Sequence, residues 1–156
     1  MAFSSVDPVG FYGKSHVTAS LGANHPQLGT VKTFEDGNTY VWAYNAGGSD
    51  INPTYAAQLN SAATNASVTV TNATNTGKVF GIVKHSTLTT GTYGWLLKEG
   101  FGTIEMHADN SAAARANLYI GADGTGAGAA ASEHPYGYLL SAGVSGTSVS
   151  AFISCF

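Results

Sequence analysis

Short runs rich in β-branched and aromatic residues recur along most of this chain, and glycine, asparagine or aspartate separates them. A run of about four to eight such residues between turn formers is typical of a strand. The runs lie at residues 30–34, 39–44, 67–71, 78–84, 92–97, 103–107, 116–120, 136–140 and 148–154. This spacing predicts an all-β fold, either an antiparallel β-barrel or β-tulip or a sandwich, and it excludes alternating βαβ units.

Two connections between these runs give finer expectations. The runs 30–34 and 39–44 flank Glu35-Asp36-Gly37-Asn38, and the Asp-Gly-Asn residues tolerate a positive φ. A loop of this kind between two β-rich runs predicts a hairpin. Lys98-Glu99-Gly100 predicts a second turn, which separates the run at 92–97 from the next one.

The chain divides into an extended N-terminal arm, residues 1–28, and a single β domain, residues 29–156. The arm carries isolated apolar residues without a period of 2 or 3.6, so it cannot form a core by itself. A disordered leader is the alternative interpretation of this segment. Within the domain, residues 54–66 alone have some helical character, and the small residues of 121–132 predict a flexible surface loop. Gly81 predicts a bulge or a close backbone approach.

Charge is scarce, and this limits the possible partners. Only 10% of the residues are charged, against an average of about 25%. The net charge is −3, Arg115 is the only arginine, and the lysines are scattered. Nucleic-acid binding needs clustered lysine and arginine, so we exclude it. A surface with so little charge is typical of a protein that is covered by partners or rigidly placed.

The N-terminal sequence has no basic region followed by an apolar stretch, so we predict no signal peptide. No run of about 18 apolar residues occurs, and we therefore expect no membrane span and synthesis in a cytoplasm. Cys155 is the only cysteine, which excludes an internal disulfide. Either it is a small buried hydrophobic residue in the last strand, or it links two subunits.

The residues that could support catalysis do not form a recognisable set. The segment 143–147 resembles the nucleophile motif G-x-S-x-G, but it lacks the final glycine and precedes a strand. His107 with Asp109, and Glu133 with His134, are pairs, whereas a metal site needs more ligands. We therefore predict that the protein is not an enzyme and that it has no cofactor and no metal.

Aromatic residues alternate on two of the predicted strands. Tyr40, Trp42 and Tyr44 share one strand face, and so do Tyr93 and Trp95. Such a face is most simply a core face. It can also be a platform that stacks on sugars or a subunit interface, since both favour tryptophan and tyrosine.

Several motifs, in the order in which they occur along the chain, resemble those of capsid decoration (cement) proteins of tailed bacteriophages. The resemblance covers residues 28–156 and leaves residues 1–27 without a counterpart. The motifs are LGT at 28–30, GNTYV at 37–41, KVFGIVKH at 78–85, TYGWLLKEGFGTIEMHAD at 92–109, LYIGADGTG at 118–126, GYLL at 137–140 and the terminal strand at 148–154.

The resemblance implies a virion protein, made in the bacterial host, that binds the outer surface of an icosahedral head and stabilises the capsid lattice. It implies two partners, the major capsid protein and other copies of this chain in a homotrimer at three-fold positions. A receptor- or glycan-binding module of a phage fibre is the alternative. We expect the subunit or capsid interface to include Phe3, Phe11, Tyr12, Leu21, Trp42, Trp95 and Phe156.

Overall fold

The computed structural model describes residues 13–22, 25–60, 69–72, 78–121, 124–128 and 135–155. Within these residues the protein is built from β-strands, nearly all of them antiparallel, which confirms the predicted all-β class. The strands are β1 (Val17–Thr18), β2 (Val31–Thr33), β3 (Thr39–Asn45), β4 (Ala56–Leu59), β5 (Thr69–Asn72), β6 (Val79–Ile82), β7 (Tyr93–Glu105), β8 (Asn117–Ile120), β9 (Gly126–Ala127), β10 (Gly137–Leu139) and β11 (Ser148–Ser154).

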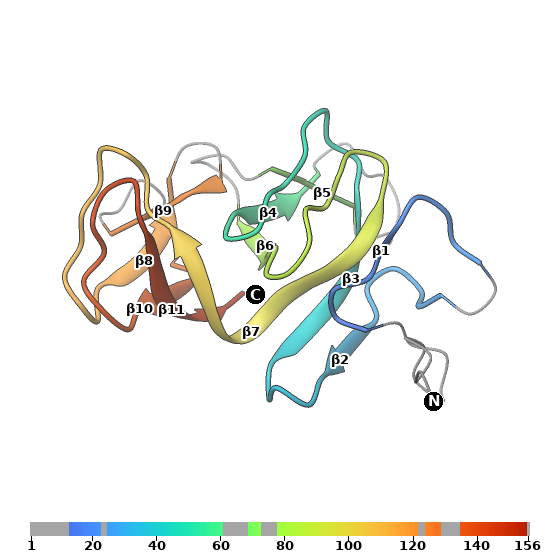
Figure 1. Ribbon diagram of the computed structural model, residues 1–156, viewed down its shortest axis with the longest axis horizontal. Coiled ribbons are helices and arrows are strands. Elements are labelled where there is room, and N and C mark those ends of the chain that lie inside the picture. Colours follow the sequence, from blue (N-terminus) through green and yellow to red (C-terminus); the bar gives the residue numbers. More distant parts are fainter. Residues whose placement is uncertain are drawn as a thin grey trace, which may run out of the picture.

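Two barrel-like halves share the long strand β7, which curves across the whole molecule (Figure 1). In the N-terminal half, the strand pairings run from β7 through β6, β4 and β5 to β3, and β3 pairs again with β7. β2 extends this half by pairing with β3, as the predicted hairpin requires. In the C-terminal half, the pairings run from β7 through β11, β10 and β8 to β9. A bridge between Met106 and Gly126 leads back to the end of β7.

The predicted turn at residues 98–100 is wrong, because β7 continues through it for 13 residues. Gly100 has a φ of 125°, a conformation that favours glycine. Beside it lies the buried amide of Asn38, whose Oδ1 accepts a hydrogen bond from the Phe101 backbone N–H at 2.7 Å. Gly100 and Asn38 therefore let one strand pass from the first half to the second without a chain reversal.

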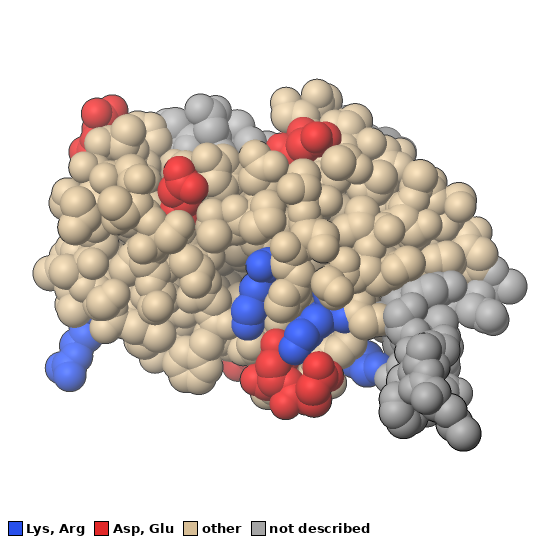
Figure 2. Space-filling model, viewed as in Figure 1, with Lys and Arg blue, Asp and Glu red and all other residues tan. Residues whose placement is uncertain are grey.

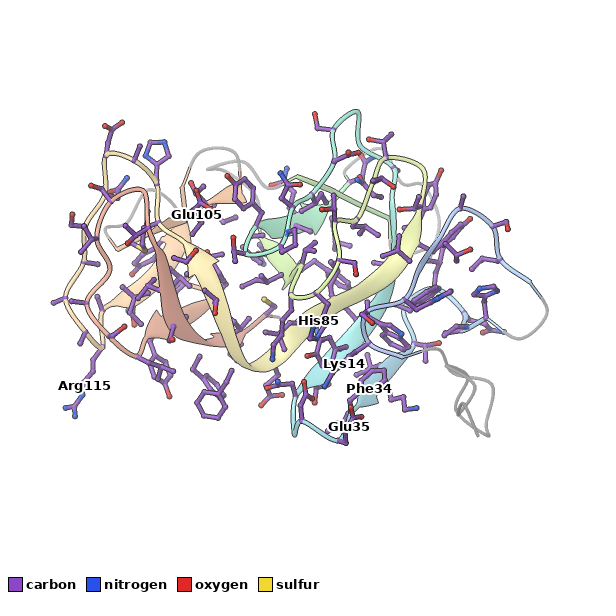
Figure 3. The ribbon with its side chains drawn as sticks, viewed as in Figure 1. Lys14, Phe34, Glu35, His85, Glu105 and Arg115 are labelled. Atoms are coloured by element: carbon purple, nitrogen blue, oxygen red, sulfur yellow. The ribbon has the colours of Figure 1, made fainter. Side chains whose placement is uncertain are left out.

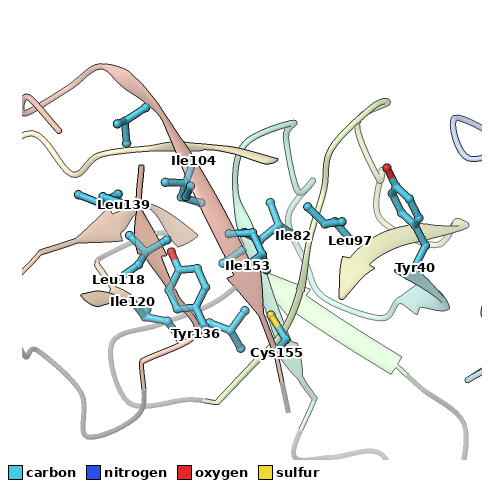
Figure 4. Packing of buried hydrophobic residues seen from close by; sticks show 14 of the residues in the cluster. Tyr40, Ile82, Leu97, Ile104, Leu118, Ile120, Tyr136, Leu139, Ile153 and Cys155 are labelled. Carbon is cyan, nitrogen blue, oxygen red and sulfur yellow. The ribbon is translucent and has the colours of Figure 1, made fainter. Parts of the chain in front are cut away.

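The main core runs through both halves along β7 (Figure 4). On one side of β3, Tyr40 and Trp42 join this core, whereas Val41 and Ala43 on the other side pack in a second cluster with Leu96. The second cluster also contains Ile51 from the loop after β3, and Val83 and Leu88 from the loop after β6. β3 is therefore buried on both faces. The main core contains Tyr40, Trp42, Ala56, Val79, Ile82, Trp95, Leu97, Ile104, Met106, Leu118, Ile120, Tyr136, Leu139, Val149, Ala151, Ile153 and Cys155.

Three local expectations have different outcomes. A Cβ at Gly81 would lie 2.7 Å from Leu96 Cβ, which confirms the predicted close approach. The segment with helical character contains strand β4 instead, because β4 pairs with β5 on one side and with β6 on the other. Within the predicted surface loop 121–132, residues 124–127 are buried and include β9, so the prediction is wrong for them.

The described part of the predicted arm, residues 13–22 and 25–28, lies against the sheet. β1 pairs with the start of β7. The rings of His16 and His25 stack on Trp42, with centroids 6.2 and 6.4 Å away. These residues therefore contribute to the folded unit, whereas residues 1–12 lie outside the described structure.

Candidate interaction surface

An aromatic row crosses the outer face of the C-terminal half. Phe101 on β7 pairs in register with Phe152 on β11, and Phe152 pairs with Tyr138 on β10. The ring centroids are 5.3 Å apart for the first pair and 5.4 Å for the second. Aromatic residues directly opposite each other on neighbouring strands stabilise the sheet by about 0.2–1 kcal/mol per pair.

Strand alternation explains why this row faces outward. On β11, Val149, Ala151 and Ile153 point into the core, so Phe152 between them points away from it. The row is exposed, since Phe101 keeps 60% and Tyr138 43% of its accessible surface. Leu140, which is 42% exposed, follows Tyr138 by two residues and extends the row into an apolar patch.

The aromatic patch comprises Phe101, Phe152, Tyr138 and Leu140. Phe101, Tyr138 and Leu140 are exposed and Phe152 is half-buried between them, so the four adjacent side chains form a cluster, whereas single exposed apolar residues are ordinary. A cluster of this kind marks an interaction surface. The patch is a candidate site for binding another protein surface.

An ionic cluster lies next to the patch, under β7 (Figures 2 and 3). Lys84 Nζ donates to the backbone oxygen of Phe101 at 2.8 Å and lies 3.7 Å from Asp36 Oδ2. Lys14 Nζ contacts the same carboxylate oxygen at 3.1 Å and Glu35 at 3.2 Å. These contacts connect the hairpin loop to the segment before β1 and to the edge of the aromatic patch.

Asp36 is the centre of the ionic cluster. It accepts hydrogen bonds from the Tyr40 hydroxyl at 2.8 Å and from the Asn38 backbone N–H at 3.1 Å. Partial burial acts to raise the pKa of Asp36, but the hydrogen bonds from Tyr40, Asn38 and Lys14 outweigh it and hold that pKa well below its usual value. Burial, together with the Asp36 carboxylate, raises the pKa of Tyr40. The site is built to keep Asp36 charged and Tyr40 protonated.

We expect Asp36→Asn to lower the free energy of unfolding by about 1–3 kcal/mol at pH 7, because buried donors lose a charged acceptor. Since the pKa of Asp36 is lowered in the folded state, its contribution is present above its ordinary pKa of 3.8 and is lost as the pH falls below that value. Denaturant titrations of both proteins between pH 7 and pH 2 measure this. Asp109→Asn, at a carboxylate that is 89% exposed, is the control. A pH-independent difference would contradict the prediction.

The structure separates the predicted interface residues into three groups. Trp42 and Trp95 keep 0% and 5% of their surface and pack edge to face with centroids 5.1 Å apart. Their assignment to an interface or to a sugar platform is wrong, because these side chains fill the core. Leu21 is 43% exposed, but it does not belong to the aromatic patch. The remaining residues, Phe3, Phe11, Tyr12 and Phe156, lie outside the described residues.

Sequence reasoning missed Phe101, Phe152 and Tyr138. Phe101 follows the residues that we predicted to form a turn, so it was not assigned to a face of any predicted strand. The signal for Phe152 was present, since the alternation of SVSAFIS puts three apolar residues on one face and Phe152 on the other. An aromatic residue on the polar face of an alternating strand indicates an interaction surface.

Cys155 is buried, and burial raises the pKa of its thiol to about 12. This favours the interpretation as a core residue over an intersubunit link, because the thiolate is the reactive form. We expect a thiol reagent at pH 8 to modify the native protein at least about 100-fold more slowly than the protein unfolded in guanidinium. Absorbance of the released chromophore measures both rates, and Cys155→Ser is the blank. Equal rates would contradict the burial.

In the described part of the chain, no three histidine, cysteine, aspartate or glutamate residues are placed to hold a metal ion. His107 and Asp109 come together at 3.9 Å, whereas Glu133 and His134 lie outside the described residues. Among the described residues there is also no helix long and apolar enough to cross a bilayer.

The comparisons with known proteins give a structural match only. No protein-family model matches the sequence, and no curated protein matches it either. Among solved structures, the chain is similar to the head fibre gp8.5 N base of bacteriophage phi29, with a TM-score of 0.55 and 16% sequence identity. The match covers 74% of this chain and 94% of that one. At this identity the likeness shows a shared fold.

Proposed function

We propose that this chain is a structural protein of a bacteriophage virion, and not an enzyme, which is carried on the outer surface of the head. The observation that supports this most is the fold shared with a phage head fibre base, which spans nearly all of that neighbour. Because the fold alone does not define a function, the proposal also needs a surface suited to assembly. The aromatic patch provides such a surface.

The finer proposal is that the protein binds the major capsid protein as a homotrimer at three-fold positions and stabilises the lattice. The scarcity of charge supports docking, since charged groups lose favourable hydration when a partner covers them. Charged atoms on the visible face of the molecule are confined to a few places, and most of that face has none (Figure 2). Weak contacts repeated around a ring would act together through their high effective concentration.

A receptor- or glycan-binding module of a phage fibre is the second candidate. The neighbour is itself part of a head fibre, which keeps this candidate open. Its main support in the sequence was a sugar platform at Trp42 and Trp95, and both side chains are buried. We therefore place it second.

Quantitative mass spectrometry of purified virions tests the proposal. We expect about one copy per major capsid subunit, the ratio at which three copies occupy every three-fold position formed by three subunits. A ratio of a few per hundred subunits would favour the fibre module. Absence from the virion would overturn both candidates.

Removing residues 1–12 tests whether the N-terminal segment attaches the protein to the head. We expect the truncated protein to keep its stability within about 0.5 kcal/mol, since every contact described above is retained. We expect it to lose most of its occupancy on heads, because the removed segment would contribute contact area to the attachment. Removing residues 1–27 is not a suitable test, because it deletes β1 and the histidines on Trp42. Undiminished occupancy of heads by the truncated protein would exclude an attachment role.

A further inference from the structure

We propose that copies of this chain associate with one another through the aromatic patch, with Arg115 of one copy facing Glu99 of the next. The inference goes beyond the homotrimer of the proposed function, because it assigns a pairwise contact between two copies to a surface. It follows from the order of side chains across four neighbouring strands.

The acidic end of this surface is on β7. Glu99 is exposed, precedes Phe101 by two residues and pairs in register with Ser154. Ser154 in turn follows Phe152 by two residues on β11. Glu99 therefore lies one step along the strands from the aromatic row, at the side of the patch that adjoins the ionic cluster.

The basic end is at the opposite side, where β8 begins. The Arg115 backbone N–H donates to the Leu139 oxygen at 2.8 Å, next to Tyr138, the last aromatic of the row. The Arg115 side chain is exposed and projects from the body of the molecule, far from Lys14 and Glu35 (Figure 3). No ion pair of Arg115 occurs among the described residues.

The backbone of Arg115 also has a φ of 67°. Residues other than glycine adopt this left-handed conformation at a cost of about 1–3 kcal/mol. The turn holds the only arginine of the chain at the border of the aromatic patch.

The surface is therefore acidic at one end, aromatic in the middle and basic at the other end. The ends lie at the first and the last of four neighbouring strands, so three strand spacings, about 15 Å, separate them across the sheet. When the basic end of one copy meets the acidic end of the next, arginine faces glutamate and aromatic rings face each other. Because both copies use the same surface, the contact is isologous and closes as a dimer about a two-fold axis, with an arginine–glutamate pair at each end. This complementarity favours a second copy of the chain as the occupant, since a covering surface of another composition would leave Arg115 and Glu99 without opposite charges.

Charge reversal tests the pairing in the purified full-length chain. We expect Arg115→Glu and Glu99→Arg each to weaken self-association about tenfold, measured by sedimentation over a range of concentrations. We expect the double variant Arg115→Glu/Glu99→Arg to restore it to within about threefold of the wild type, because the pair is then reversed and intact. Phe101→Ser should weaken it about 30-fold or more, as loss of a central aromatic does.

Asp109→Arg is the matched control for Glu99→Arg, because it makes the same change in charge, from −1 to +1, away from the patch and should leave association unchanged. A monomeric wild-type chain at high concentration would overturn the inference. So would a double variant no better than its single variants, or an unaffected Phe101→Ser. Circular dichroism of each variant excludes misfolding as the cause of a loss. A chain that self-associates but is absent from virions would refute the proposed function and leave this inference standing.

Discussion

Replacement of Gly100 by alanine is expected to destabilise the protein by about 3–5 kcal/mol. Two effects add up here. An alanine at a φ of 125° is strained, and its Cβ would collide with the side chain of Asn38, whose Oδ1, Cγ and Cβ atoms lie around that position. Asn38 is buried, so it cannot move without breaking its hydrogen bond to the Phe101 N–H. Chemical denaturation measures the change.

Gly37→Ala is the matched control for this prediction. Gly37 has a φ of 74°, but a Cβ there would meet no atom within 4 Å. The control variant therefore has the backbone strain without the collision, and we expect its free energy of unfolding to fall by about 1 kcal/mol. If both variants lose the same stability, the contact between Gly100 and Asn38 does not hold β7 in its path.

Trp42→Ala is expected to lower the free energy of unfolding by about 3–5 kcal/mol. Trp42 is fully buried between the Trp95 ring on one side and the His16 and His25 rings on another, so its removal leaves a cavity beneath three aromatic contacts. Thermal and denaturant unfolding measure the effect.

Phe101→Ala is the control for Trp42→Ala, because it also truncates an aromatic residue but at a side chain that is 60% exposed. We expect it to change the stability by less than about 1 kcal/mol. This contrast also separates the two possible roles of aromatics in this protein. If Phe101→Ala destabilises as much as Trp42→Ala, the aromatic patch belongs to the core and is not available for a partner.

The sequence predicted most strands of this fold from local chemistry alone. Residues 39–44 and 148–154 have alternating or β-rich patterns. Such patterns predict a strand whatever its position in the fold, because the side-chain period of a strand is 2. The hairpin loop at Asp36 and Gly37 could also be predicted from the sequence, because few residues tolerate a positive φ. The all-β class follows from these local signals.

The role of Gly100 could not be predicted in the same way. Lys98-Glu99-Gly100 has the chemistry of a turn, and only the buried Asn38 side chain, more than sixty residues earlier in the chain, makes it part of a continuous strand. Likewise, β4 is a strand because β5 and β6 pair with it, and the small residues of β9 are buried because β8 and Met106 lie beside them. These outcomes depend on distant partners, which local propensity does not contain.

For the candidate interaction surface, too, some features follow from the sequence and others only from the tertiary structure. By itself, the sequence determined that tryptophan, tyrosine and phenylalanine would line strand faces, because alternation fixes which residues share a face. Only the tertiary structure decided which faces are inside. β3 is covered on both sides, so Trp42 is in the core, whereas β10 and β11 are covered on one side, so Tyr138 is exposed and Phe152 half-buried. The physical reason is that burial is a property of packed layers, and the number of layers over a strand depends on pairings between residues far apart in the chain.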